Sequence, residues 1–512
     1  MNSDYLDRMK EEHVWFLNMS VLFGILFTVL IYKNMTSVTF PILIICVTVF
    51  SFLFLQRAGI SVRKWTGLYA AGMLLLGVST CLTANGFFHF FNAVGILLLF
   101  MDGMAYQLYD NKSWGFEEYA ANFFIFIGKW MGALSCPFRH RKISGGTDRK
   151  DYMKKHKNAG AVICGILIAV LFLIVVLPLL MMSDRVFSSV FENVFGILNP
   201  LNIFEHIDIG NIVGIILTFF AGALFFYAFF AALFRNDMTR TVKSTVEKAN
   251  PLTGITFGMI IAVIYILYSG IQIGFLFLRL GNLPDGMTYS QYAHEGFWQL
   301  LFVSIINFAV VLICVKVFQD NRTLRIILTV ISLCTCVMIL SAGYRMVLYI
   351  REYNLTFLRV LVLWFLALLM VIFGGVIFWV FRKDFPLFRY MIIVVSVCYI
   401  GLSLSRVDGI IAGYNIRNTD QINENDIYYL MYGLSADAAP EIAEIQMEIL
   451  QENNMYEDVA AYFRVRKGEG EELNIRNWNF SRSDAAQAAE KWLESTEQQG
   501  SPVNNEGISG IR

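Results

Sequence analysis

The chain has 512 residues, of which 57% are hydrophobic and only 16% are charged. Soluble domains carry about 25% charged residues, so this composition excludes an ordinary soluble protein and indicates an integral membrane protein. The formal net charge is zero, but the residues from Arg406 onward carry −10 and those before it carry +10. A basic membrane part and an acidic tail are expected on opposite sides of a bilayer.

Eleven apolar runs are long enough to cross a bilayer, which predicts an all-α membrane domain over residues 1–405. They cover residues 14–32, 38–55, 66–82, 84–101, 160–182, 210–234, 254–278, 297–318, 325–344, 358–381 and 389–405. The segments expected on the side of the N-terminus hold 25 Lys and Arg residues, against six on the other side. Because basic loops stay in the cytoplasm, we expect a cytoplasmic N-terminus and an extracytoplasmic C-terminus.

Two apolar segments are not expected to cross the bilayer. Residues 121–135 are short and contain Lys129, and a crossing here would move the basic loop 139–157 outside, so we predict an interfacial or re-entrant helix. Residues 184–204 repeat apolar side chains at helical spacing, which is typical of an amphipathic helix on the outer surface. The basic loop indicates anchoring inside the cell, since no aromatic residues are interleaved to favour nucleic acid.

The C-terminal part is expected to form a small helical extracytoplasmic domain over residues 406–495, followed by a disordered tail over 496–512. The sequence predicts a short helix over 423–433, and then a helix after Ser435 that carries Ile442, Ile445 and Ile449 on one face. A helix over 455–466 should be broken by the segment Gly468-Glu-Gly-Glu-Glu, and the last helix should begin at Ser481 or Ser483 and continue to about Ser495.

Several short motifs in the second half of the chain resemble a known family. They are Tyr292-Ala293-His294-Glu295-Gly296-Phe297, Leu355-Thr356, Ile411-Ala412-Gly413-Tyr414-Asn415-Ile416, Leu434-Ser435-Ala436-Asp437-Ala438-Ala439-Pro440 and Asn477-Trp478-Asn479-Phe480-Ser481. Together they resemble the domain-of-unknown-function 4173 family of bacterial multipass membrane proteins, over roughly residues 160–495. The resemblance implies a membrane fold and a bacterial cell envelope location, and it implies no reaction.

Polar segments should meet on the outer face at the mouth of the helix that begins near residue 297. The candidate ligand-binding residues are Tyr292, Glu295, Arg345, Tyr349 and Arg359, and Arg406-Val407-Asp408 starts the tail on the same side. One interpretation is ion pairing of Glu295 with Arg345 or Arg359. A second is a site for a phosphate or carboxylate headgroup, since arginine binds such groups with two parallel hydrogen bonds. A third is an acid–base role for Glu295 or His294.

The sequence contains no phosphate loop, no HExxH motif and no serine-nucleophile elbow. No cysteine lies in the tail, so we predict no zinc site there. We also predict no other metal site, no cofactor and no catalytic residue. The favoured interpretation is therefore a non-enzymatic envelope scaffold or sensor. The alternative is a transporter or flippase of an anionic or lipid-linked solute, with Gln272, Gln299 and Asn307 lining its interior. An envelope enzyme on a lipid-linked substrate is the third. The expected partners are the lipid bilayer and an anionic lipid or an envelope protein, and not nucleic acid.

Overall fold

The computed structural model describes residues 3–109, 114–140, 209–235, 248–274, 297–382, 384–418 and 422–498. Within these ranges the secondary structure is helical, and extended pairing is confined to an isolated bridge between Ala249 and Phe318. Nine of the described helices are long and apolar enough to cross a membrane. The expected all-α membrane fold is thus confirmed, and the chain is a multipass membrane protein.

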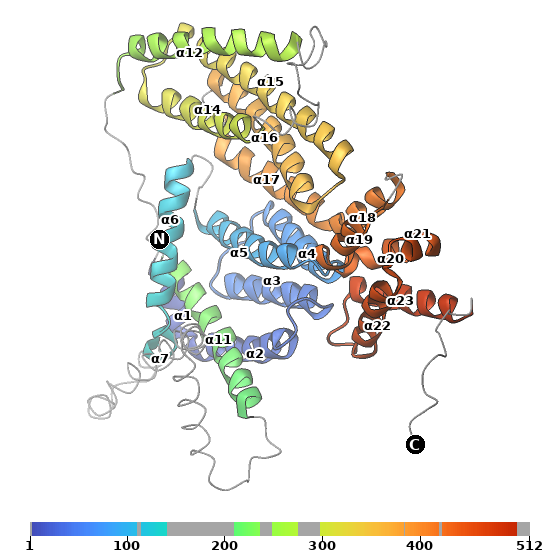
Figure 1. Ribbon diagram of the computed structural model, residues 1–512. Helices are drawn as coiled ribbons and strands as arrows, with labels where there is room; N and C mark the ends of the chain where they lie inside the picture. The colour runs from blue at the N-terminus through green and yellow to red at the C-terminus, as the bar shows by residue number, and fades with distance from the viewer. Residues whose placement is uncertain are drawn as a thin grey trace, which may run out of the picture.

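A first bundle is built mainly from the N-terminal third of the chain (Figure 1). It contains α1 (Ser3–Glu11), α2 (His13–Ile31), α3 (Thr39–Arg57), α4 (Thr66–Leu82), α5 (Gly86–Leu108) and α11 (Ile209–Phe234). Its core is rich in aromatic rings, and the ring centroids of Phe23 in α2 and Phe226 in α11 are 4.1 Å apart. These stacked rings hold α11 against α2 although nearly 200 residues separate the two helices.

One helix of the first bundle lies differently from the others. In Figure 1, α6 (Phe116–Gly132) runs crosswise to α3, α4 and α5 at the end of the bundle where α7 (Cys136–His140) follows. Its first turn carries Glu117 and Glu118, and its last turn carries Lys129. The interfacial or re-entrant position expected for residues 121–135 stays a prediction.

A second bundle contains α12 (Pro251–Gln272), α14 (Phe297–Val317), α15 (Arg322–Tyr353) and α16 (Phe357–Phe381). A further helix, α17 (Leu387–Leu404), packs against α16 on one side and against α4 on the other, so it links the two bundles. The 32 residues of α15 rise about 48 Å, which exceeds the roughly 30 Å of a hydrocarbon core. Part of α15 therefore extends beyond the membrane.

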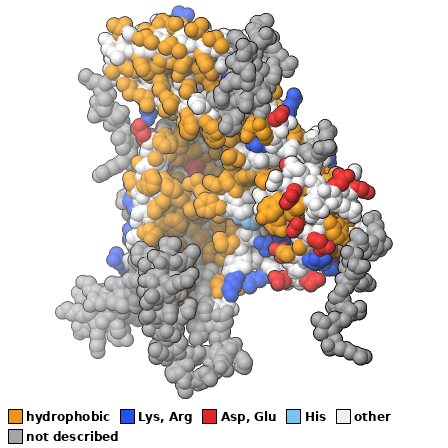
Figure 2. All heavy atoms as spheres, viewed as in Figure 1, with side chains coloured by type: hydrophobic (Ala, Val, Ile, Leu, Met, Phe, Trp, Pro, Cys, Tyr) orange, Lys and Arg blue, Asp and Glu red, His pale blue; other side chains and the backbone are white. Residues whose placement is uncertain are grey.

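Residues 407–498 form a group of short helices, which we call the C-terminal cap. Its elements are α18 (Val407–Asn418), α19 (Glu424–Tyr428), η3 (Tyr429–Gly433), η4 (Ala436–Ala438), α20 (Ala439–Ile442), α21 (Met447–Glu452), α22 (Tyr456–Glu471) and α23 (Phe480–Gln498). The cap lies at the ends of both bundles in Figure 1. Figure 2 shows apolar side chains over the bundles and acidic and basic side chains gathered over the cap. This contrast indicates that the cap lies in water while the bundles contact lipid.

Ten of the eleven expected spans coincide with a helix of the structure. The remaining span, 160–182, lies outside the described residues, as do the segment 184–204 and most of the basic loop. The number of membrane crossings therefore stays a prediction. Two helices are longer than expected: α5 continues past residue 101 to Leu108, and α15 continues past residue 344 to Tyr353.

Within the cap, one expected helix is wrong. The helix over 455–466 ends as expected, because α22 stops at Glu471, inside the segment Gly468-Glu-Gly-Glu-Glu. A Cβ atom at Gly470 would lie 2.3 Å from the Cβ of Ala486, so this glycine allows α22 to approach α23 closely. Ile442, Ile445 and Ile449 do not share one helix, because α20 ends at Ile442 and α21 begins at Met447. α23 continues to Gln498, close to the end expected near Ser495, and most of the expected disordered tail, residues 499–512, lies outside the described ranges.

Candidate functional site

The structure places three of the five expected outer-face residues near the turn between α15 and α16. These are Arg345 and Tyr349 in α15 and Arg359 in the first turn of α16. Tyr292, His294 and Glu295 lie outside the described residues. The expected ion pairing of Glu295 with an arginine therefore stays a prediction.

Tyr349 and Arg359 contact each other. The guanidinium carbon of Arg359 lies 4.4 Å from the centroid of the Tyr349 ring, and its Nη1 donates hydrogen bonds to the carbonyl oxygens of Tyr353 and Asn354. Asn354 follows α15 with a φ of 64° and ends the helix. Arg359 thus stabilises the C-terminal carbonyl groups of α15, where a cation is favoured. A cavity of about 230 Å³ lies beside the two side chains, between Phe297, Trp298 and Met346.

Arg345 belongs to a different environment. Its side chain is buried, and its Nη2 donates a hydrogen bond of 3.4 Å to Oε1 of Gln272 in α12. The same oxygen accepts a hydrogen bond of 2.6 Å from the Ser341 hydroxyl. Arg345 therefore faces α12 and does not line the cavity beside Arg359. Of the described candidates, the structure brings together Tyr349 and Arg359 and keeps Arg345 apart.

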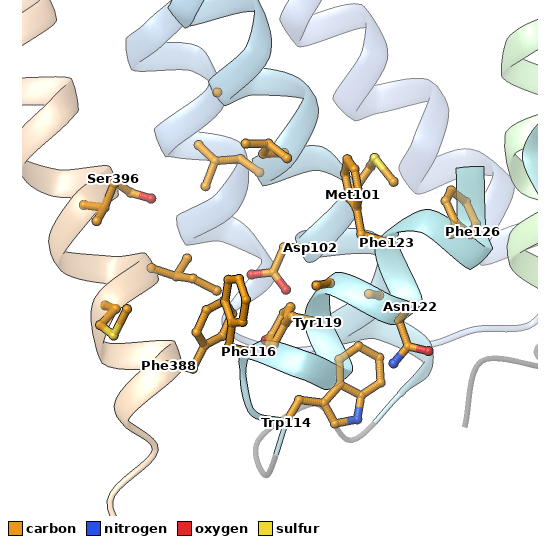
Figure 3. Close-up of a pocket in the computed structure, with 18 of the residues that line it drawn as sticks. Met101, Asp102, Trp114, Phe116, Tyr119, Asn122, Phe123, Phe126, Phe388 and Ser396 are labelled. Atoms are coloured by element: carbon orange, nitrogen blue, oxygen red, sulfur yellow. The ribbon is translucent and has the colours of Figure 1, made fainter. Parts of the chain in front are cut away.

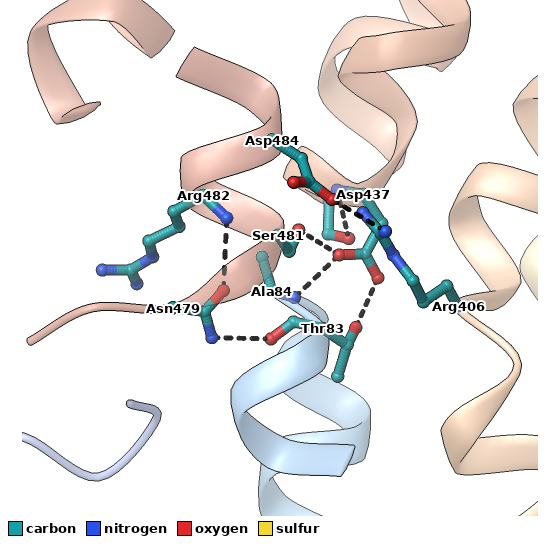
Figure 4. A network of polar contacts seen from close by, with 9 residues as sticks. Thr83, Ala84, Arg406, Asp437, Asn479, Ser481, Arg482 and Asp484 are labelled. Carbon is teal, nitrogen blue, oxygen red and sulfur yellow. Dashed lines mark hydrogen bonds and ion pairs between the residues drawn. The ribbon is translucent and has the colours of Figure 1, made fainter. Parts of the chain in front are cut away.

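A larger group of polar contacts lies where the cap meets the first bundle (Figure 4). The buried carboxylate of Asp437, in η4, accepts a hydrogen bond of 2.9 Å from the Ala84 amide. It also accepts hydrogen bonds from the hydroxyl groups of Thr83 and Ser481. Thr83 and Ala84 lie in the turn between α4 and α5, whereas Ser481 lies in α23. One carboxylate therefore joins a membrane-helix turn to two elements of the cap.

A second buried carboxylate, Asp408 in α18, lies in the same region. Its Oδ2 accepts hydrogen bonds of 2.8 Å from the Asn85 side chain and 3.0 Å from the Ser435 amide. Its Oδ1 has no hydrogen-bond partner among the described residues. Burial raises the pKa of Asp408 above its ordinary value, and the hydrogen bonds from Ser435 and Asn85 oppose this rise. Asn85 also accepts a hydrogen bond from the Phe87 amide and so begins α5.

The segment before α23 extends these contacts to the turn between α2 and α3. The Asn479 side chain donates hydrogen bonds of 2.7 Å to the Thr36 carbonyl and 3.1 Å to the Thr83 carbonyl. The Val38 amide donates to the Trp478 carbonyl at 2.9 Å. We call this set the cap junction; it comprises Thr83, Ala84, Asn85, Asp408, Asp437, Asn479 and Ser481.

The hydrogen bonds of the cap junction hold the cap against the first bundle. All three donors to Asp437 are neutral groups, so this buried side chain keeps its hydrogen bonds only while the turn and α23 keep their positions. Among the described residues, no group of three or more His, Cys, Asp or Glu side chains could hold a metal ion. The arrangement can therefore fix the cap on the first bundle and make that contact sensitive to geometry.

The cap meets the second bundle through two polar contacts and a continuous apolar core. The Asn415 side chain accepts from the Leu355 amide at 2.8 Å and donates to the Leu355 carbonyl at 2.9 Å. The Tyr429 hydroxyl accepts from the Phe357 amide at 3.2 Å. The buried apolar cluster extends without a break from Phe297 and Leu366 in the second bundle to Phe463 and Trp492 in the cap.

Residue types alone did not indicate the roles of Asp437 and Asn479. Both nevertheless lie in motifs that carried the family resemblance, as do Ser435, Asn415 and Leu355, and all of them contribute to contacts between the cap and the bundles. The sequence feature that could have indicated the junction was therefore the presence of these polar residues in the family-like motifs.

A scan against protein-family models finds a match over residues 70–445, more than half of the chain, to a model described as "Domain of unknown function (DUF4153)". Its number differs from the 4173 of the resemblance, and both are domains of unknown function. The matched range contains Asp408 and Asp437 and ends before Asn479. No curated protein and no solved structure matches the chain.

Proposed function

The chain belongs to the DUF4153 family of domains of unknown function, and we propose that it is a membrane scaffold or sensor whose C-terminal cap ties two helix bundles together. The excess of basic residues on one side of the expected spans supports a cytoplasmic N-terminus and an extracytoplasmic cap. On this proposal the protein lies in the cell membrane of a bacterium, and the cap meets a partner in the cell envelope.

The observation that best supports this function is the position of Asp437. Its carboxylate joins the turn between α4 and α5 to α23, while the apolar core of the cap continues into the second bundle. A partner that shifted the cap would therefore act on both bundles at once. Such a rigid element at an interface between two packed groups is a common basis for switching.

The cap also offers a surface for a partner. Tyr428 and Tyr432 are more than half exposed, and their ring centroids are 4.7 Å apart. Exposed tyrosines are enriched at the centres of protein interfaces, because they combine a large apolar ring with a hydrogen-bonding hydroxyl. The cap is acidic overall, so a partner with a basic contact segment fits its charge.

Site-specific photo-crosslinking in intact cells tests this function. A crosslinker at position 432 should give one discrete adduct, which Tyr428→Ala should abolish while membrane insertion stays intact. A crosslinker at Val465 in α22 provides the matched control, because it is as exposed as Tyr432 and lies in another helix of the same cap. Equal adducts at both positions, or an adduct unchanged by Tyr428→Ala, would count against a specific partner surface.

A second candidate function is transport of an anionic or lipid-linked solute, and buried Arg345 favours it. Arg345 directly follows the expected span 325–344, and a buried arginine at the end of a membrane-spanning helix is a candidate for binding an anionic solute. However, the polar side chains nearby are paired with one another: Gln272 with Ser341, and Asn307 with Tyr265 and Thr335. Gln299 is exposed on the bundle surface. These contacts support tight helix packing, so we place transport second.

Proteoliposomes decide between the two functions. Transport predicts a flux of at least one of a panel of organic and inorganic anions, or flipping of an anionic lipid, that Arg345→Gln abolishes. Flux equal to that of protein-free vesicles across the panel would remove this candidate and leave the scaffold proposal standing.

A further inference from the structure

An apolar groove lies at the end of the first bundle that faces away from the cap. It has a volume of about 530 Å³ and lies between α5, α6 and α17 (Figure 3). Leu98 and Leu99 of α5, Phe116 of α6, and Met391 and Val395 of α17 line it. Figure 2 shows the same face hollowed among apolar side chains, with an acidic side chain visible inside. Cavities of this size and polarity are typical of sites for small apolar molecules.

The groove is long and follows the membrane-spanning helices. Its lining on α17 begins at Phe388, next to the helix start, and continues to Ile400. At 1.5 Å per residue this stretch rises about 18 Å. One leaflet of a bilayer is about 15 Å thick, half of a hydrocarbon core of about 30 Å. The groove therefore reaches from the membrane surface to about the middle of the membrane.

Polar groups lie at one end of the groove, where Asp102 and Tyr119 line it and Tyr69 and Arg389 lie beside it. The Asp102 carboxylate lies there and points toward Tyr119 in Figure 3, and the hydroxyl groups of Tyr69 and Tyr119 hydrogen-bond to it. Arg389, next to Phe388, acts electrostatically on both tyrosines, and its guanidinium carbon lies 5.4 Å from the centroid of the Tyr106 ring. All these residues lie within two turns of a helix end, so we expect them near the level of the lipid headgroups.

We propose that this groove holds one acyl chain of a bilayer phospholipid, with the lipid phosphate at Arg389. The apolar lining and the length of the groove match a chain that crosses one leaflet. The guanidinium group suits the phosphate because it donates two parallel hydrogen bonds. A second arginine, Arg63, lies 5.3 Å from the same Tyr106 ring and adds positive charge at this end. The proposal is independent of any partner of the cap.

Native mass spectrometry of the full chain, extracted from nanodiscs of palmitoyl-oleoyl phosphatidylethanolamine and phosphatidylglycerol, tests the acyl-chain site. The wild-type protein should retain one phospholipid after delipidation. Ser396→Trp should reduce this retention roughly tenfold, because Ser396 extends from α17 into the groove and a bulky ring would fill it. Val397→Trp is the matched control, since Val397 is 64% exposed on the same helix and does not line the groove.

A second pair of measurements tests the phosphate. Arg389→Gln should weaken phospholipid retention roughly tenfold and leave retention of the matching diacylglycerol unchanged. Equal retention by Ser396→Trp and Val397→Trp would overturn the proposal, as would wild-type protein that retains diacylglycerol as well as phospholipid. If Ser396→Trp unfolds, Val395→Phe narrows the same groove and carries the same expected loss.

Discussion

The C-terminal cap meets the two bundles in two physically different ways. Toward the first bundle the contact is polar and directional, made by Asp437, Asp408 and Asn479. Toward the second bundle it is mainly an apolar core that runs from α14 and α16 into α22 and α23. Apolar burial is non-directional and scales with area, whereas each hydrogen bond contributes only about 1 kcal/mol net and requires exact placement. The polar contact should therefore open first, with the cap remaining on the second bundle.

The largest effect is expected in the apolar contact. Ile411 in α18 is fully buried in the shared core. Replacing it with alanine removes three buried carbon atoms and leaves a cavity, so Ile411→Ala should destabilise the protein by about 2–5 kcal/mol. Denaturant titration of the purified protein, with the cap and the second bundle reported by separate probes, should show both unfolding earlier. Loss confined to the first bundle would contradict a shared core.

A smaller effect is expected when the polar contact loses its central acceptor. Asp437→Ala removes both accepting oxygen atoms and leaves the donors of Thr83, Ala84 and Ser481 without this acceptor. The cost should be about 1–3 kcal/mol. Hydrogen exchange should increase in α23 and in the turn between α4 and α5. If hydrogen exchange were unchanged in both segments, Asp437 would not stabilise the contact between the cap and the first bundle.

Asn479→Ala should also lower the stability of the folded protein, by less than the change at Asp437. It removes the donor to the Thr36 and Thr83 carbonyls, at a cost of about 1 kcal/mol. Arg417→Ala is the control, because its ion pairs with Glu441 and Glu444 are on the surface of the cap and largely screened by water. Equal loss of stability in the two variants would show that the cap junction stabilises the protein no more than a surface ion pair of the cap does.

The pH dependence of Asp408 sharpens the comparison further. Burial raises the folded-state pKa of Asp408 above its unfolded value. Its contribution to stability is therefore fully present below the unfolded pKa and is lost as the pH rises through the folded pKa. Asp408→Asn should remove this dependence, so the variant should gain stability relative to wild type as the pH rises over that window. A difference that is constant with pH would indicate that the two states share one pKa.

Much of the membrane part could be predicted from sequence, because apolar length alone decides whether a helix can cross a bilayer. The end of α5 was misplaced because Asp102 interrupts the apolar run, and its hydrogen bonds with Tyr69 and Tyr119 come from other helices. The groove beside Asp102 was missed for the same reason.

The candidate site was harder to predict because its contacts join distant segments. Thr83 and Asp437 are 354 residues apart, and no periodicity in either segment indicates the other. The sequence placed the end of the span 325–344 before Arg345 and Tyr349, whereas α15 continues to Tyr353. The sequence also could not show that Gln272 binds Arg345, or that Arg359 would bind the last carbonyl groups of α15.

The most direct test of the cap as a tie between bundles is a pair of spin-label distance measurements in nanodiscs. One pair, Met35 and Val465, spans the polar contact, and the other, Leu358 and Val465, spans the apolar contact; all three positions are more than half exposed. In the double variant Asp437→Ala and Asn479→Ala, the distance distribution of the first pair should broaden while that of the second stays narrow. Two unchanged distributions, or two that broaden equally, would contradict the account.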